Sequence, residues 1–308
     1  MKTFTKLFTA TLLCVLSLSL ITACGPKGPK KPSVSTNEVI TQSVAKMEEM
    51  MGISAPAETQ TVAFTLPNYT VDYANERLSV LRGSGIGLYF AQYVAGESVA
   101  LADDVIYKDT VTAEDVTLDF LLKKSAVEGG IHLTMEMHQT NSGEAAVSPI
   151  QIYFAYDYTA KKPVKTTIVS ANERAGGYDL AVAQFDYGTQ TAYSYNFTLA
   201  AADLSPLKTA LTEKTLDFEG LSEYSLYRYV FAKLHADTGT VEAYGYQAGS
   251  TDEISATETE VSTLYNGIYA QVKDACVPVA LLDDAAATQK VFYQDMWAYG
   301  SSRVMAIE

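Results

Sequence analysis

Residues 131–138 are Ile-His-Leu-Thr-Met-Glu-Met-His, and their alternation sets the fold class. Apolar Ile131, Leu133, Met135 and Met137 occupy every second position, with polar side chains between them. Successive side chains of a β-strand point to opposite faces, so a period of two predicts a strand with one buried and one wet face. The residues before this stretch follow a helical period. A sheet is therefore expected to begin here.

Four further strand-like runs follow at short intervals. Turn-forming residues separate the runs, for example Asn141-Ser142-Gly143 and Lys161-Lys162-Pro163. Such short joins favour antiparallel pairing, because parallel strands need long crossover connections. The runs are Ile150–Tyr158, Val164–Ala171, Tyr178–Tyr187 and Thr191–Ala200. We therefore expect an antiparallel β-meander of about five strands.

Helical patterns lie before and after the predicted meander. Ser35 and Glu38 match a capping box, and the apolar spacing behind them ends at Gly52. A second helical region, about 75–94, has three glycines between 83 and 87 that should bend or break it. Helices are also expected from Ser205-Pro206, over 221–234, from Ser255 and over 284–299. This block order predicts an α+β fold.

The N-terminus has the features of an export signal. Lys2 and Lys6 precede a stretch, 7–21, that is apolar apart from Ser and Thr and too short to span a bilayer stably. Leu20-Ile21-Thr22-Ala23-Cys24 follows and resembles a bacterial lipobox. The resemblance implies cleavage before Cys24, acylation of that residue and anchoring in the cell membrane, facing outside the cytoplasm. An ordinary secretory signal or an uncleaved anchor is the alternative.

Composition divides the chain into four parts. We expect a signal peptide at 1–23, a lipidated cysteine with a Pro- and Lys-rich tether at 24–35, a mainly helical part at 36–130, and the sheet with its following helices at 131–308. The tether should be extended, because Pro-rich segments favour polyproline conformation. The last two parts can form one domain.

Charge and cysteine content restrict the partners of the body. Residues 36–308 contain 17 basic residues and all 36 acidic residues of the chain. The resulting net charge of −19 disfavours binding to nucleic acid. With Cys14 in the signal and Cys24 lipidated, Cys276 is the one cysteine of the body. It is in phase with the apolar face of a predicted helix, which favours a buried thiol over a reactive one.

The best candidate metal ligands are His132, Glu136 and His138, which share one face of the first predicted strand. Alternate strand residues lie close enough for Glu136 and His138 to reach one ion, with help from a neighbouring strand. The alternative is a wet, polar face opposite the apolar one. No catalytic motif is recognisable, and the glycines at 83–87 match neither a dinucleotide fingerprint nor a phosphate loop, so no cofactor is expected.

Tyrosine is unusually frequent, with 21 residues against one tryptophan. Seven of the tyrosines fall in the predicted meander, where they suit a sheet that is apolar on one side and wet on the other. They could line a groove for sugar, peptide or lipid, or only pack across strands.

A curved antiparallel sheet with helices across it, in an exported and anchored protein, resembles the LolA/LppX type of lipoprotein carrier over 131–240. This resemblance is one of architecture without a shared motif, so no functional residue is transferred. It implies an apolar cavity between sheet and helices.

Three functions follow from these patterns. The first is a non-enzymatic, membrane-anchored lipoprotein that binds a ligand or protein partner of unknown identity. The second is a carrier of lipids or other hydrophobic ligands. The third is a metal-assisted hydrolase that uses His132, Glu136 and His138.

Overall fold

A ten-stranded sheet is the largest structural feature of the chain that the structure describes. The structure is a computed structural model that describes residues 34–52, 85–96, 101–113, 116–141, 144–247, 258–293 and 295. The strands are β1 (Ile106–Ala113), β2 (Val116–Val127), β3 (Gly130–Asn141), β4 (Glu144–Asp157), β5 (Lys162–Arg174), β6 (Gly177–Asp186), β7 (Thr191–Ala200), β8 (Ser225–His235), β9 (Thr240–Gln247) and β10 (Thr288–Gln289). Val34–Glu308 form one unit.

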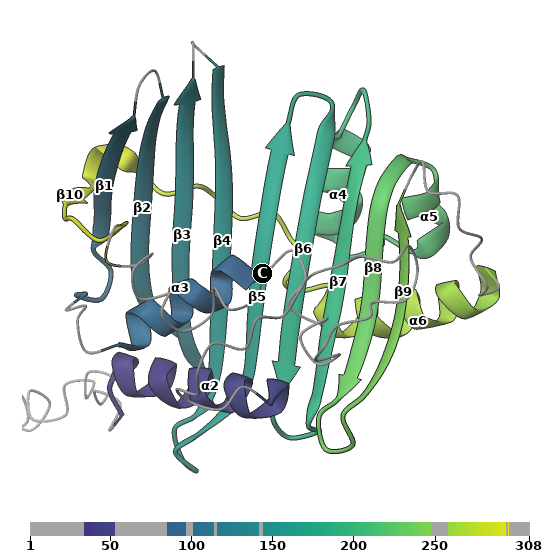
Figure 1. Ribbon diagram of the computed structural model, residues 1–308, viewed down its shortest axis with the longest axis horizontal. Helices are drawn as coiled ribbons and strands as arrows, with labels where there is room; N and C mark the ends of the chain where they lie inside the picture. Colours follow the sequence, from purple (N-terminus) through teal and green to yellow (C-terminus); the bar gives the residue numbers. More distant parts are fainter. Residues whose placement is uncertain are drawn as a thin grey trace, which may run out of the picture. The chain divides into compact units, whose positions relative to one another are not determined.

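Chain order and sheet order agree from β1 to β9. Each of these strands pairs antiparallel with the next, and β10 pairs parallel with β1 at the end of the sheet (Figure 1). The broad α+β class is right, but the prediction of about five strands was wrong. The five predicted runs are β3 to β7, and the meander continues on both sides of them.

Two of the strands that the sequence pattern missed, β2 and β8, are buried on both faces over part of their length. In β2, Phe120, Leu121 and Leu122 are all buried, although successive residues face opposite sides. In β8, four consecutive residues from Tyr229 to Ala232 are buried. A strand covered on both sides loses its apolar and polar alternation, because each position contacts protein. For this reason the predicted helix over 221–234 was wrong, and only α5 (Phe218–Ser222) is helical there.

The expected last helix, over 284–299, was wrong in its first part, although Tyr293 and Asp295 are helical. Asp283 caps a single 3-10 turn, η3 (Asp284–Ala286), and β10 follows directly. The backbone then bonds to the sheet: the N–H of Lys290 donates to the carbonyl of Lys108 in β1. Pairing with β1 therefore replaces the hydrogen bonds that a helix would have made within itself.

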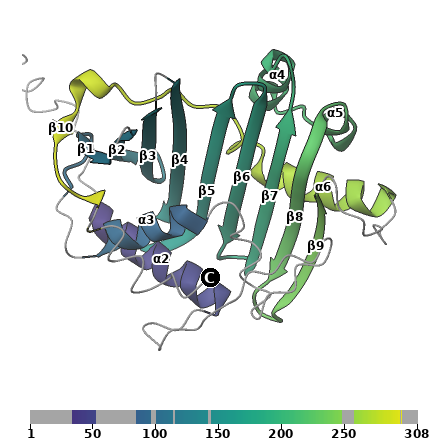
Figure 2. The same cartoon turned by 45° about the horizontal axis from the view of Figure 1, so that its top comes forward.

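Helices cover both faces of the sheet. On one face, here called the α2 face, lie α2 (Thr36–Met51) and α3 (Gly85–Ala95), which contact strands β3 to β5. On the other, the α6 face, lie α4 (Ser205–Glu213), α5 and α6 (Glu258–Val272) (Figures 1 and 2). The predicted start and end of α2 are confirmed, since Ser35 accepts from the N–H of Glu38 and Gly52 is left-handed. In the described residues, no helix is both long and apolar enough to cross a membrane.

Two apolar cores result, one on each face. Ile168 and Val169 of β5 are neighbours in the chain, yet Ile168 belongs to the core under α2 and α3 and Val169 to the core under α4 and α6. The same sheet thus carries both cores.

The chain after α6 returns across the whole sheet. Residues 273–289, here called the crossing segment, leave α6, run along the α6 face and reach β1 through η3 and β10 (Figure 1, yellow). One irregular segment therefore connects two parts of the sheet that are far apart in the strand order.

Candidate functional site

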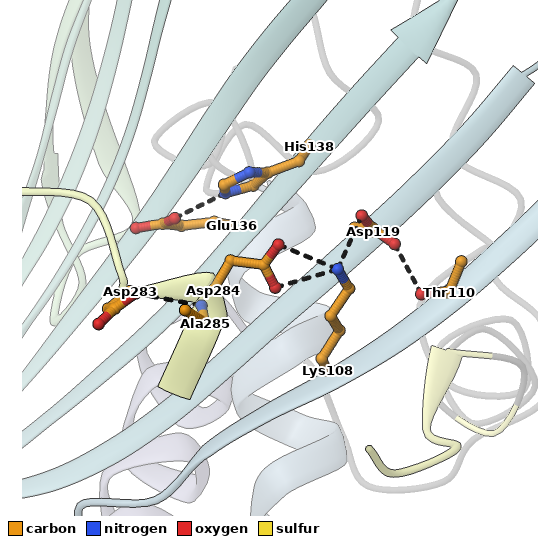
Figure 3. Close-up of polar contacts among 8 residues, drawn as sticks. All are labelled: Lys108, Thr110, Asp119, Glu136, His138, Asp283, Asp284 and Ala285. Atoms are coloured by element: carbon orange, nitrogen blue, oxygen red, sulfur yellow. Dashed lines mark hydrogen bonds and ion pairs between the residues drawn. The ribbon is translucent and has the colours of Figure 1, made fainter. Parts of the chain in front are cut away.

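The predicted metal ligands lie on the α6 face, under the crossing segment. Glu136 and His138 are brought together: His138 Nε2 lies 2.8 Å from Glu136 Oε2 (Figure 3). The other carboxylate oxygen, Oε1, accepts a hydrogen bond of 2.7 Å from the N–H of Leu282. Glu136 is fully buried, so both of its oxygens have protein partners. The carboxylate holds the crossing segment to β3.

His132 is separated from that pair. It stacks on Tyr153 of β4, with ring centroids 4.3 Å apart, and its Nε2 contacts Gln151 Oε1. Burial lowers the pKa of His132, which favours the neutral ring. Within the described residues, no group of three or more His, Cys, Asp or Glu is placed to share a metal ion. Because Glu136 and His132 already have protein partners, we do not carry the metal-assisted hydrolase forward.

A second anchor of the crossing segment is centred on Lys108 of β1. Its Nζ lies 3.0 Å from Asp119 of β2 and 3.0 Å from Asp284 of η3 (Figure 3). Hydrogen bonds to Asp119 and Asp284 raise the pKa of Lys108. Burial opposes ionisation of Asp119, but hydrogen bonds from Thr110 and Lys108 outweigh it and hold the pKa of Asp119 below its usual value. One lysine thus links two strands and the crossing segment.

Asp109, on the opposite face of β1, holds the residues that follow the crossing segment. Its Oδ2 accepts hydrogen bonds of 2.8 Å from the N–H groups of Phe292 and Tyr293. The chain therefore passes from one face of the sheet to the other at β10 and is held on both sides of β1.

Between its two ends the crossing segment covers a cavity of about 440 Å³. Strands β4 to β6 form the floor and the residues after α6 form the roof. The lining is mainly apolar: Val147, Pro149, Val169, Ala171, Tyr178, Leu180, Ala275, Cys276, Val277, Pro278, Val279 and Leu281. In the roof, Val279 and Leu281 remain 40% and 51% exposed, a large exposure for apolar side chains.

Polar side chains complete the cavity wall. The ion pair of Lys208 and Glu173, 2.6 Å apart, lies in the wall, and so do Gln151 and Tyr153. Gln151 is buried, and its Oε1 accepts from Thr134 at 2.9 Å. Burial raises the pKa of Tyr153, so its hydroxyl stays protonated and able to donate. The cavity therefore suits a ligand that is apolar over most of its surface and polar in part.

Cys276 is buried, as predicted, and lines the same cavity. Burial raises the pKa of its thiol, and its Sγ contacts the carbonyl of Val272 in α6. The thiolate, which is the reactive form, is thus disfavoured. Cys24, the expected lipid-attachment residue, lies outside the described residues.

Sequence reasoning did not find the cavity. Its floor was predicted as strands, but no position was predicted for its roof, which lies between the helices expected from Ser255 and over 284–299. No pattern in residues 273–289 points to β4, since Leu281 and Pro149 are more than a hundred positions apart. The run Val277-Pro278-Val279, apolar and without a helical period, was the one local signal of a covering segment.

No protein-family model matches this chain, and no curated protein or solved structure matches it either.

Proposed function

We propose that this protein is a membrane-anchored binding protein that holds a small, mainly apolar ligand outside the cytoplasm. The observation that carries the proposal is the cavity under the crossing segment. Its volume of about 440 Å³ lies within the range of small-molecule sites, which is about 300–1,000 Å³. The lipobox-like stretch ending at Cys24 supports the anchor.

The residue types of the lining restrict the class of ligand that the cavity can hold. Apolar side chains come from both floor and roof, and the Lys208–Glu173 pair offers one charged group of each sign. A single-chain or single-ring amphiphile therefore matches the cavity better than a lipid with several acyl chains. The LolA/LppX-type expectation placed a cavity between the sheet and its helices, whereas buried side chains fill the core beneath α2 and α3.

The proposal is tested by filling the cavity. Ala171 lies in the floor on β5, and Ala171→Phe would place a ring where the ligand is expected. Ala126→Phe is the matched control, because Ala126 is exposed near the end of β2 and is not part of the lining. Both variants are made in the chain carrying Cys24→Ser, so that acylation does not alter the mass.

Native mass spectrometry and titration with 1-N-phenylnaphthylamine give the readouts. We expect a co-purified adduct or probe binding in the parent and in Ala126→Phe, and at least tenfold weaker binding in Ala171→Phe. Equal binding by all three proteins would place the ligand elsewhere. Absence of both adduct and probe binding in the folded parent would refute an apolar ligand site.

A further inference from the structure

A second hollow lies on the α6 face, between helix α6 and strands β7 to β9. Its volume is about 680 Å³, and it shares no lining residue with the cavity under the crossing segment. We call it the α6 groove. Thr259, Thr263 and Gln271 line it from the helix, and Tyr193 and Tyr244 line it from the strands. Aromatic and hydrogen-bonding groups therefore face one another across the groove.

Gly267 occupies the groove side of α6 without a packing reason. A Cβ built on Gly267 would meet nothing within 4 Å, and no left-handed φ requires glycine there. Glycine lowers helix stability relative to alanine, so an unforced glycine in the middle of a helix runs against the local rule. Departures from local rules that packing does not explain are expected at functional sites. Here glycine keeps the groove open at mid-helix.

The charged groups that the strands contribute to the groove are already paired, and Glu260 of α6 is a further acidic residue of the lining. Glu242 Oε1 lies 3.1 Å from His235 Nε2 and 4.0 Å from Lys233 Nζ. The strand charges are thus balanced by neighbours in β8 or β9, and an ionic ligand would have to break those contacts. A neutral ligand would use the hydroxyl and amide groups of the helix wall without that loss.

We infer that the α6 groove binds a neutral carbohydrate. The apolar C–H faces of a sugar ring suit the rings of Tyr193 and Tyr244, whose hydroxyls also supply hydrogen bonds. The sugar hydroxyls suit Thr259, Thr263 and Gln271. An anchored protein with this second site would hold a short glycan in addition to the apolar ligand, and the two sites would be independent.

The inference is tested by blocking the groove at Gly267. Gly267→Phe fills the open space, and Asn266→Phe makes the same change at the exposed neighbouring position, which is not part of the lining. Gln271→Ala is a milder variant that removes one amide from the helix wall. Isothermal titration with maltotriose, cellotriose and triacetylchitotriose measures binding, and thermal unfolding confirms that each variant is folded.

We expect one or more of these trisaccharides to bind the parent and Asn266→Phe equally, at least tenfold more weakly to Gly267→Phe, and severalfold more weakly to Gln271→Ala. Binding of 1-N-phenylnaphthylamine should be unchanged in all three variants, which separates this site from the first. Failure of every trisaccharide to bind the folded parent at millimolar concentration would overturn the inference. So would unchanged binding in both Gly267→Phe and Gln271→Ala.

Discussion

Glu136 is a buried carboxylate with two separate partners, His138 and the N–H of Leu282. We expect Glu136→Ala to lower the free energy of unfolding by about 1–3 kcal/mol, because the part-buried Leu282 N–H loses its acceptor. Glu136→Gln, which keeps an acceptor oxygen, should lose less. Urea denaturation measures both, and hydrogen exchange of the Leu282 amide should quicken in the alanine variant.

Glu128→Ala is the control for that experiment. Glu128 is exposed in the turn between β2 and β3, so its removal should change stability by no more than about 0.5 kcal/mol. If Glu136→Ala were equally harmless, the carboxylate would not hold the crossing segment.

The ionisation of Asp119 makes the stability of the fold depend on pH in the acid range. Its pKa in the folded protein lies below the ordinary value of 3.8, so its ionised form stabilises the fold fully above that pH. This contribution is lost as pH falls through the lower, folded value. We expect Asp119→Asn to be less stable than the parent at pH 7, with a difference that shrinks below pH 3.8. Urea titrations across this range measure it, and a difference that stays constant down to about pH 2 would contradict the linkage.

The sequence allowed part of this site to be predicted. Glu136 and His138 were expected on one strand face, because a period of two puts them there. The partner of Glu136, Leu282, was not predictable, since it follows 146 residues later in a segment without regular structure. The residue types and the period of two thus predicted where Glu136 and His138 lie on the strand, but not the contact of Glu136 with Leu282.

Two glycines in helices should respond in opposite ways when alanine replaces them: one substitution should lower the stability of the protein and the other should raise it. A Cβ on Gly87 of α3 would lie 2.3 Å from Cγ2 of Ile168, a stiff β-branched side chain in β5, whereas one on Gly267 meets open space. Gly87→Ala should therefore lower stability by about 1–3 kcal/mol through overpacking. Gly267→Ala should raise it by about 0.5–1 kcal/mol through helix propensity.

Thermal and urea unfolding of the two alanine variants provide the comparison. The substitution is the same in each, so the contrast isolates packing from propensity. If both alanine variants were more stable than the parent, Gly87 of α3 would not pack closely against Ile168 of β5.

The helix prediction over 221–234 failed because apolar side chains lie on both faces of β8. β3, with one apolar and one polar face, was recognisable from eight residues. Residues 225–235 of β8 show apolar spacings of three and four because both faces are covered, and these spacings imitate a helix. The distinction required knowing that α6 and the neighbouring strands would cover that segment.

At the scale of the molecule, the two cores share their sheet, so they should unfold together. Ile168→Ala in the α2-face core should cost about 2–5 kcal/mol, and Val169→Ala in the α6-face core somewhat less. Both variants should keep a single transition that coincides in far-ultraviolet circular dichroism and tyrosine fluorescence. Two separated transitions in either variant would show that the faces are independent folding units.

The late position of the crossing segment in the sequence also sets the order in which the floor and the roof of the cavity are synthesised. Synthesis proceeds from the N-terminus, and the floor of the cavity, on β4 to β6, is complete by residue 186. The roof, from Ala275 to Leu281, emerges almost a hundred residues later. A nascent chain would therefore pass through a stage in which the proposed binding surface is folded but uncovered, so a ligand present at that stage would be enclosed as the last segment docks on β1.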